Sequence, residues 1–566
     1  MELGRWVVRA GSAAAMVAVV AALAGAGPGR LAVVRPVSAR AAAVPRAGLS
    51  GYYSKVKWAA CSHGIARPFQ CASEPVPLNY ADPGGRRIKI ALIRLPAADP
   101  KKRIGSLFVN FGGPGGPGVT DLASRAYTVF SSAVRARFDL VSWDPRGIQY
   151  SDPLNCFASA TASQGYFNSD PVFPYPQTQE PAFFTLNAQL GKDCEQRAPV
   201  LLRHISTTDT ARDLALLRRD VGDKKLTYLG FSYGTVIGAT YANLFPGNVR
   251  AMVLDGSLDF KGNVTGDQPG DSSRYPIDVR QGVDKGGQDI FGRFLTLCAI
   301  AKSKCAFSVG GNLPAKWATL LSRAQAGQLS YQNLMIYAYY DMEKPIADWP
   351  GLASYLQGLY TATSAGQVLS ARREAGLARA ASTAVSQSLT GPPAAKGPAL
   401  AAGRPGQAGT AATAAYAGNT EEAYYAIQCA DSLVPTQASV YHNLASSEDA
   451  AVPGFGRLIV YDTMPCATWP AMHTDAYNGP WNRSRTTILV INALHDPFTP
   501  IAGARAGARE LVNARLLTVN GDGHTSMYVE PSTCRDHAEL AYLVSGKLPA
   551  RGAVCPVNAL PFGLTP

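Results

Sequence analysis

The sequence predicts an α/β protein whose doubly wound, mostly parallel sheet is interrupted by an inserted, mainly helical domain. Up to about residue 259, short apolar runs of strand type alternate with amphipathic helical stretches. Strand patterns are scarce from about 260 to 480 and resume near 487. Buried parallel strands are short and nearly continuously apolar, and their alternation with helices favours a parallel sheet. The last strands of the sheet are therefore expected after a long insertion.

The individual elements follow from the same patterns. A helix is expected to begin at Thr208 and Asp209 and to end near Gly222. Within the insertion, apolar positions recur at helical spacing around 291–300 and 352–359. The expected strands comprise residues 87–95, 106–111, 138–143, 226–231, 251–254, 487–494 and 516–520.

Composition divides the chain into four parts. Residues 1–43 have the charged start, short apolar stretch and small residues of a signal peptide and leader, and the apolar run is too short for a comfortable membrane span. Residues 44–259 and 481–566 are expected to form the two parts of the sheet domain. Residues 260–480 are the expected helical cap, with a low-complexity loop at 380–419 that is rich in Ala, Gly, Pro and Thr.

Charge and composition exclude some classes of function. Hydrophobic residues make up 47% of the chain and charged residues 16%, which is typical of a compact globular protein. The formal net charge is +13, but Lys and Arg are scattered singly or in pairs without a basic run. No nucleic acid partner is expected, and no membrane span in the mature form.

The ten cysteines agree with export. None forms a C-x-x-C pair, which disfavours a zinc ribbon or a redox motif. An even number of cysteines in an exported protein favours disulfides. Pairing each cysteine with its neighbour along the chain is the arrangement we expect, although sequence alone does not fix the connectivity.

One motif carries the chemistry. Gly230-Phe231-Ser232-Tyr233-Gly234 matches G-x-S-x-G, directly after an expected strand and at the start of an expected helix. In a nucleophile elbow the serine occupies a tight, strained turn, and glycines leave room where side chains would collide. This context predicts the α/β-hydrolase fold, with Ser232 as the nucleophile and the backbone N–H of Tyr233 as an oxyanion donor.

A serine nucleophile needs a base, and in this fold the acid and the histidine follow later strands in that order. Asp496 stands just after the strand expected at 487–494, and His524 follows the last expected strand in a glycine-rich loop. His524 is expected to take the proton of Ser232, and Asp496 to fix the imidazole tautomer and stabilise the imidazolium.

Other residues compete for these roles. Asp522 and Asp255 are rival acids, but Asp522 lies too close to His524 in sequence to reach behind its imidazole. His495 is expected to be a bystander beside the acid, and His537 a surface residue on a helix.

The second oxyanion donor is expected from the glycine-rich loop at 110–118, where Gly113 is favoured because glycines permit close backbone approach to a ligand. A phosphate-binding loop is the alternative. No G-K-S/T follows, and prolines remove N–H donors, so a nucleotide site is disfavoured. After the next strand, Asp144 and Arg146 are expected to form a buried pair that braces the active-site loops.

These motifs together, in this order and spacing, resemble the secreted tripeptidyl aminopeptidases of actinobacteria, relatives of the prolyl iminopeptidases within the α/β-hydrolases. The likeness covers roughly residues 58–556 and includes Ala426-Ile427-Gln428-Cys429-Ala430-Asp431. It departs from the prolyl iminopeptidases at Phe111, where those carry a histidine, and at the extra stretch 380–419. Both departures bear on the choice of substrate more than on the triad.

The resemblance implies release of short peptides, typically tripeptides, from free N-termini. Such enzymes need an anionic feature that holds the substrate ammonium group, and Glu421 and Glu422 are candidates. The alternative is an ordinary helix N-terminus, which favours acidic residues. Asp341, Glu343 and Asp348 are weaker candidates.

The expected function is thus that of an exported, monomeric serine exopeptidase acting on peptides, with no cofactor and no metal. A carboxylesterase or lipase-like hydrolase is the nearest alternative, because a catalytic triad does not distinguish amides from esters. A non-catalytic binding protein that kept the fold is the alternative from another class.

Overall fold

The structure, a computed structural model, describes residues 54–62, 64–363 and 418–566. The expected leader at 1–43 lies outside the described residues, as does all of the low-complexity stretch 380–419 except its last two residues.

A ten-stranded sheet forms the centre of the described chain, in the order β1-β2-β3-β5-β4-β6-β7-β8-β9-β10. From β5 to β10 every neighbouring pair is parallel, whereas the pairs from β1 to β3 and the pair of β3 with β5 are antiparallel. The strands are β1 (Ala59–Ala60), β2 (Gln70–Pro77), β3 (Arg87–Leu95), β4 (Gly105–Asn110), β5 (Phe138–Trp143), β6 (Leu226–Phe231), β7 (Val249–Asp255), β8 (Ile488–His495), β9 (Ala514–Asp522) and β10 (Val554–Pro556).

All seven strands expected from the sequence are present, and three were missed. β1 and β10 are very short, and β2 contains Glu74, Pro75 and Pro77, which break the apolar pattern of a buried strand. Strands near a sheet edge tolerate proline because one row of their N–H groups has no partner in the ladder. The sheet is therefore mostly parallel, with an antiparallel edge that the apolar runs did not indicate.

Two helical layers cover the sheet, because successive side chains of a strand point to opposite faces. In β7, Met252 and Leu254 pack with one layer and Ala251 and Val253 with the other. The first layer contains α5 (Thr207–Asp220), α6 (Gly234–Leu244) and α18 (Ile501–Glu510), and the second contains α1 (Gly118–Val129), α2 (Ser132–Arg137) and α20 (Thr533–Ser545). The first turn of α5 is capped by the side chain of Ser206, two positions before the expected start at Thr208.

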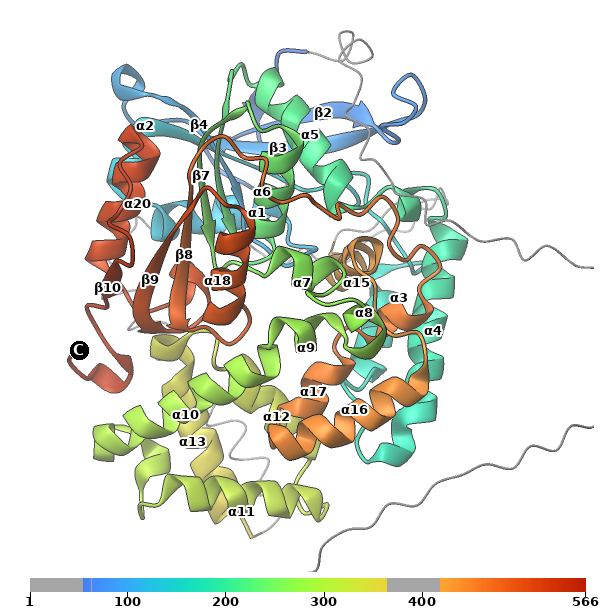
Figure 1. Cartoon of the computed structure of the whole chain (residues 1–566), viewed down its shortest axis with the longest axis vertical. Helices are drawn as coiled ribbons and strands as arrows, with labels where there is room; N and C mark the ends of the chain where they lie inside the picture. Colours follow the sequence, from blue (N-terminus) through green and yellow to red (C-terminus); the bar gives the residue numbers. More distant parts are fainter. Residues whose placement is uncertain (1–53, 63, 364–417) are drawn as a thin grey trace, which may run out of the picture. The chain divides into compact units, whose positions relative to one another are not determined.

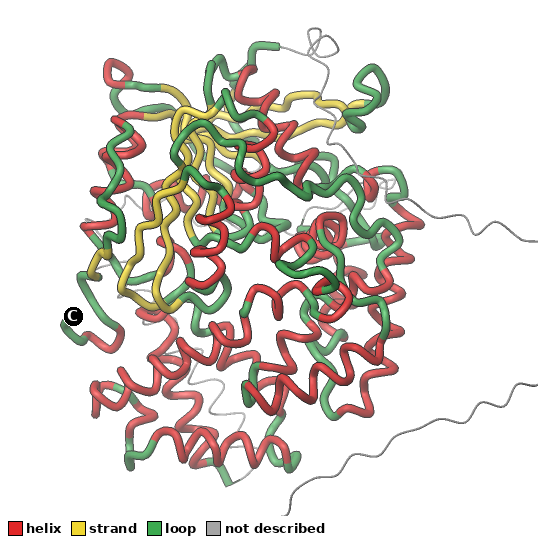
Figure 2. Tube along the Cα trace, viewed as in Figure 1, coloured by secondary structure: helices red, strands yellow, loops and turns green. Residues whose placement is uncertain are grey.

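Between β7 and β8 the described residues form helices and loops only, as Figure 2 shows by colour. Helices α10 to α13, α16 and α17 bury a separate aromatic-rich core of their own, which includes Phe291, Trp317 and Trp349. The inserted helices are α7 (Phe260–Val264), α8 (Asp271–Arg274), α9 (Ile277–Gln281), α10 (Val283–Ala301), α11 (Leu313–Gln325), α12 (Tyr331–Tyr340), α13 (Pro345–Thr361), α15 (Thr420–Asp431), α16 (Ala438–Ala451) and α17 (Gly456–Tyr461). We call these helices the cap.

The cap contacts the carboxyl end of the sheet. A Cβ atom on Gly286 of α10 would lie 2.6 Å from Pro500, just after β8, and one on Gly523 would lie 2.7 Å from Pro345 of α13. Figure 1 shows α10 to α13 beyond this end of β8 and β9. The remaining helices are α3 (Ala160–Ser169) and α4 (Glu180–Arg197) before α5, and α19 (Thr525–Tyr528) after β9.

Five disulfides join the ten cysteines, each to its neighbour along the chain. The expected pairing is confirmed. In the part of the chain that the structure describes, no helix has the length and apolar character needed to cross a membrane.

The expected pair of Asp144 with Arg146 is wrong in its partners. The Arg146 guanidinium is fully buried and binds Asp213 through two hydrogen bonds of 2.7 and 2.8 Å, with Asp209 at 3.3 Å. Asp144 instead accepts the backbone N–H groups of Val119 and Tyr150. Asp144 and Arg146 are both buried and hold loops in place, as expected. The partners of Arg146, however, belong to α5, more than 60 residues further along the chain.

Replacing Arg146 with Met should destabilise the fold strongly, since Asp213 and Asp209 would remain buried without their cation. We expect the free energy of unfolding to fall by about 3–5 kcal/mol in urea unfolding experiments. Arg146→Lys keeps the charge but loses the forked geometry. Its free energy of unfolding should therefore lie between those of Arg146→Met and the wild type. A loss below about 1 kcal/mol in Arg146→Met, typical of exposed pairs, would contradict the bracing role.

Candidate active site

Ser232 lies on the turn between β6 and α6 with a left-handed backbone, φ 53°. Its N–H donates to the carbonyl of Asp255 at 2.8 Å. A Cβ atom on Gly230 would lie 2.4 Å from the carbonyl oxygen of Gly234, so a side chain there would collide with the turn. Left-handed backbone at a non-glycine residue is strained, and this turn raises the serine above the end of the sheet.

The glycine-rich loop after β4 lies directly against this turn. Gly112 has φ +94°, and a Cβ atom on it would lie 2.8 Å from the carbonyl of Phe231 and 2.9 Å from Cβ of Ser232. Gly113 follows with φ +109°. Within the described residues, the backbone N–H groups of Gly113 and Tyr233 have no hydrogen-bond acceptor. Both of the donors expected from the sequence are therefore free to bind a ligand oxygen.

Asp496 and His524 form a buried, hydrogen-bonded pair. Nδ1 of His524 lies 2.9 and 3.1 Å from the two carboxylate oxygens of Asp496. The carboxylate also accepts hydrogen bonds from Phe498, Thr499 and Thr525. Asp496 is 1% exposed and His524 7% exposed. These contacts fix the orientation of the imidazole.

The electrostatic environment of His524 follows from this pair. Burial disfavours the imidazolium, but the charge of Asp496 and its hydrogen bond outweigh burial and raise the pKa of His524 above its ordinary value. A base of this kind accepts a proton readily and is then stabilised by the carboxylate behind it.

Asp255 connects the serine turn to the histidine turn. Its carbonyl accepts the N–H of Ser232, and its Oδ1 accepts the N–H of Ser526, two residues after His524, at 2.9 Å. Burial raises the pKa of the Asp255 carboxyl to about 6. A residue that the sequence offered as a rival acid thus holds the two turns together.

The other rivals lie elsewhere. The carboxylate of Asp522 binds Arg293 of the cap helix α10, at 3.0 and 3.3 Å, and not the imidazole. His495 contacts Asp289 at 2.6 Å, and His537 is exposed on α20. Among the acids weighed from the sequence, Asp496 is the one that contacts His524.

The cap contacts His524 as well. The backbone N–H of His524 donates to the carbonyl of Glu343, between α12 and α13, at 3.0 Å. The ring of Phe498 lies 5.1 Å from the imidazole, and Tyr339 of α12 lies 5.1 Å from Phe498. Phe111 stacks on Phe231 beneath the serine turn, at 6.0 Å. Phe498 therefore contacts both the imidazole of His524 and Tyr339 of the cap, and Phe111 packs on Phe231 in the sheet domain.

Glu422 has a structural role that the sequence did not indicate. Glu422 is fully buried, and its carboxylate accepts hydrogen bonds from the N–H of Cys156 and the hydroxyl of Ser163. It holds the loop after β5 onto α15 and is not open to a substrate ammonium group. Glu421, the other candidate, is exposed at the start of α15.

Helix α15 braces both loops that carry the oxyanion donors expected from the sequence. A Cβ atom on Gly115 would lie 2.4 Å from the carbonyl of Thr420, in the first turn of α15. At its other end, Asp431 accepts hydrogen bonds from the N–H and hydroxyl of Thr207, and that hydroxyl contacts the phenol of Tyr233. The Ala426–Asp431 motif is part of the family resemblance. Its final residue, Asp431, is the one that holds Thr207 in this contact.

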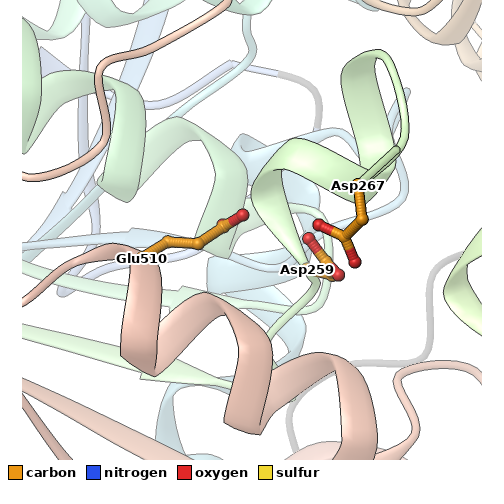
Figure 3. Close-up of side chains that lie close together, drawn as sticks. All are labelled: Asp259, Asp267 and Glu510. Carbon is orange, nitrogen blue, oxygen red and sulfur yellow. The ribbon is translucent and has the colours of Figure 1, made fainter. Parts of the chain in front are cut away.

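One cluster of carboxylates could in principle attract a cation. Oxygens of Asp259, Asp267 and Glu510 lie within 4.8 Å of one another, as Figure 3 shows. Asp259 and Glu510 accept the backbone N–H groups of the first turn of α7, namely those of Gly262, Phe260 and Lys261. Burial and Asp259 raise the pKa of Glu510 to about 8. The cluster caps a helix, and we assign it no metal.

Comparison with known proteins agrees with this geometry. Residues 113–285 match the family model described as the alpha/beta hydrolase fold, and residues 450–555 match the model described as TAP-like protein. The chain is a serine hydrolase of the α/β-hydrolase fold.

The C-terminal match makes the assignment more particular: the chain combines this fold with a TAP-like domain. It is 28% identical to tripeptidyl aminopeptidase of Streptomyces lividans over 93% of this chain and 90% of that protein. It is 29% identical to serine protease Hip1 of Mycobacterium tuberculosis, over 86% and 87%, and 28% identical to carboxylesterase B of the same species, over 88% and 89%. The resemblance expected from the sequence is confirmed.

Removing the Asp431 carboxylate should impair turnover more than substrate binding. In Asp431→Ala, Thr207 and Tyr233 lose their buried anchor, and the N–H of Tyr233 is held less well. We expect kcat for an acyl ester to fall about 10-fold with KM within about twofold, less than the loss of a whole oxyanion donor.

The conservative variant Asp431→Asn keeps one acceptor for Thr207 and should recover part of kcat. Circular dichroism and the unfolding midpoint identify variants that lose activity through misfolding. Unchanged kcat in a folded Asp431→Ala protein would rule out the positioning role.

Proposed function

We propose that this chain is an exported serine exopeptidase that releases short peptides, typically tripeptides, from free N-termini through an acyl-enzyme on Ser232. The observation that carries the proposal is the hydrogen-bonded pair of Asp496 and His524 at the same edge of the sheet as the strained turn of Ser232. Similarity to a tripeptidyl aminopeptidase over most of both chains supports the choice of substrate.

The mechanism follows from the chemistry of these groups. His524 accepts the proton of the Ser232 hydroxyl as its oxygen attacks the carbonyl carbon of the scissile bond, and then donates that proton to the leaving amine. Water repeats the sequence and hydrolyses the acyl-enzyme. Asp496 fixes the imidazole tautomer, and the N–H groups of Gly113 and Tyr233 stabilise the oxyanion. No step needs a cofactor.

A carboxylesterase is the second candidate, and one observation favours it. Carboxylesterase B is as similar to the chain as the tripeptidyl aminopeptidase is, with 28% identity. Since the same triad attacks amides and esters, the difference between the two functions lies in how the cap binds the acyl group. Export is supported by the five disulfides, which persist in oxidising compartments.

Matched substrates separate these functions. We expect the purified enzyme to cleave a chromogenic tripeptide amide with a free N-terminus and to cleave its N-acetylated counterpart at least about 100-fold less well in kcat/KM, because a blocked amine loses its charge-assisted contacts. Ser232→Ala should abolish turnover while still binding the peptide in calorimetry.

Each alternative has its own signature in this assay. Equal cleavage of the blocked peptide would contradict an exopeptidase, and turnover of a simple acyl ester alone would favour the esterase. Full activity in Ser232→Ala would place the nucleophile elsewhere.

The pKa of His524 predicts the acid limb of the pH–rate profile. Only the neutral imidazole accepts the serine proton, so kcat/KM should rise with pH, and its midpoint should lie above about 6.5 because the pKa is raised. In Asp496→Asn the pKa of His524, followed by NMR of the imidazole, should fall. A midpoint at or below 6.5 in the wild type would contradict the role of Asp496.

A further inference from the structure

One face of the cap helix α10 lies along the segments that carry the carboxylate and the imidazole of the triad. This face consists of Gly286, Asp289 and Arg293, which are three and four positions apart and therefore lie on the same side of the helix. A Cβ atom on Gly286 would lie 2.6 Å from Pro500 and 3.1 Å from the carbonyl oxygen of Asp496. The helix therefore packs directly against the turn that begins with the acid.

The other two residues of this face contact the ends of β8 and β9. Asp289 lies 2.6 Å from Nδ1 of His495, the last residue of β8. One turn further along α10, the Arg293 guanidinium donates to both carboxylate oxygens of Asp522, the last residue of β9, at 3.0 and 3.3 Å. One helix face thus contacts both strand ends, one residue before the acid and two residues before the base.

The ion pair of Arg293 with Asp522 is the stronger of these two links. Asp289 is exposed, and exposed ion pairs contribute little to stability. Asp522 is fully buried, as is Glu530, whose carboxylate accepts the backbone N–H of Asp522 at 2.8 Å. Burial and the charge of Asp522 raise the pKa of Glu530 well above its ordinary value. Asp522 is therefore the ionised member of the two carboxyls, and Arg293 is the cation that it binds.

The ladder between β8 and β9 is irregular at this point. Pairing is regular up to Ala493 opposite Val519, and the next pair is His495 opposite Asp522, so an advance of two residues along β8 matches one of three along β9. Beyond this shift, the N–H of Gly523 donates to the carbonyl of His495 at 3.0 Å. A bulge disrupts the ladder and bends the strand. The regular part of the sheet thus ends before the acid and the base, and contacts from outside it contribute to setting their distance.

We propose that Arg293 is a positioning residue through which the cap sets the place of His524 relative to Asp496. Arg293 acts through Asp522 and the end of β9, while Gly286 on the same helix face holds the turn of the acid. This role rests on the proposed functions of Asp496 and His524, and not on the choice between a peptide and an ester as substrate.

Arg293→Met removes the link between α10 and β9. We expect kcat to fall about 10-fold with KM within about twofold, for whichever of the tripeptide amide and the acyl ester the wild type cleaves, because a displaced base impairs every acyl transfer. Arg293→Lys keeps the charge and should recover part of kcat. Lys285→Met removes an exposed cation from the same helix and should leave kcat unchanged.

The pH–rate profile separates positioning from the charge of Arg293. Loss of a cation alone would raise the pKa of His524, because a nearby positive charge disfavours the imidazolium. A looser contact with Asp496 would lower it, because burial opposes the imidazolium and the charge of Asp496 is what outweighs burial. The other carboxyls whose charge acts on His524, those of Glu343 and Asp255, stay in this variant. We therefore expect the acid limb of kcat/KM to move to lower pH in Arg293→Met.

A double variant separates positioning from stability. Arg293→Met alone leaves Asp522 buried without its cation and should lower the urea midpoint of unfolding. Adding Asp522→Asn removes the unpaired charge and should restore the midpoint, but kcat should stay low because the ion pair between α10 and β9 is still missing. The double variant carries the comparison if Arg293→Met alone does not fold.

The possible outcomes distinguish this role from the proposed triad. Wild-type kcat in the folded double variant, or an acid limb that stays in place or moves to higher pH in Arg293→Met, would overturn the positioning role while the triad stands. Full activity in Ser232→Ala would refute the triad itself, and the role of Arg293 would fail with it.

Discussion

Close approach of backbone to backbone at the carboxyl end of β6 is the constraint on which the rest of the site depends. The register of β4 with β6 places Asn110 opposite Gly230, so the loops that follow both strands meet. Only glycines allow this contact, since a Cβ atom on Gly112 would lie 2.8 Å from the carbonyl of Phe231, and one on Gly234 would lie 2.9 Å from that of Asn110. The turn that lifts Ser232 out of the sheet is strained, and the packing around it keeps it in place.

The cap has a structural role in the site besides covering it. Helix α15 touches the oxyanion loop at one end and the Tyr233 side chain, through Thr207, at the other. A cap carbonyl, that of Glu343, receives the backbone N–H of His524. The turn of Ser232 and the imidazole of His524 are thus positioned partly by a segment inserted between two strands, so the geometry of the candidate site depends on the packing of the insertion.

The sheet domain and the cap differ in how their buried charged groups are paired. Arg146 and its two aspartates form a satisfied network in the sheet domain, where every charge has a partner. Asp278 in the cap has a buried carboxylate oxygen without a hydrogen-bond partner among the described residues, although such a group is costly to bury. The first arrangement is what a brace requires.

The sequence alone determined the sheet strands with continuous apolar runs, the positions of Asp496 and His524 just after two of the last strands, and the neighbour pairing of the cysteines, because each of these depends on local pattern or chain order. It missed β2, whose prolines and glutamate hide an antiparallel strand. It also gave Arg146 the wrong partner and left Glu422 open to a substrate. Only the tertiary structure decided the partners of buried polar groups, since these depend on contacts between segments far apart in the chain, which no local periodicity encodes.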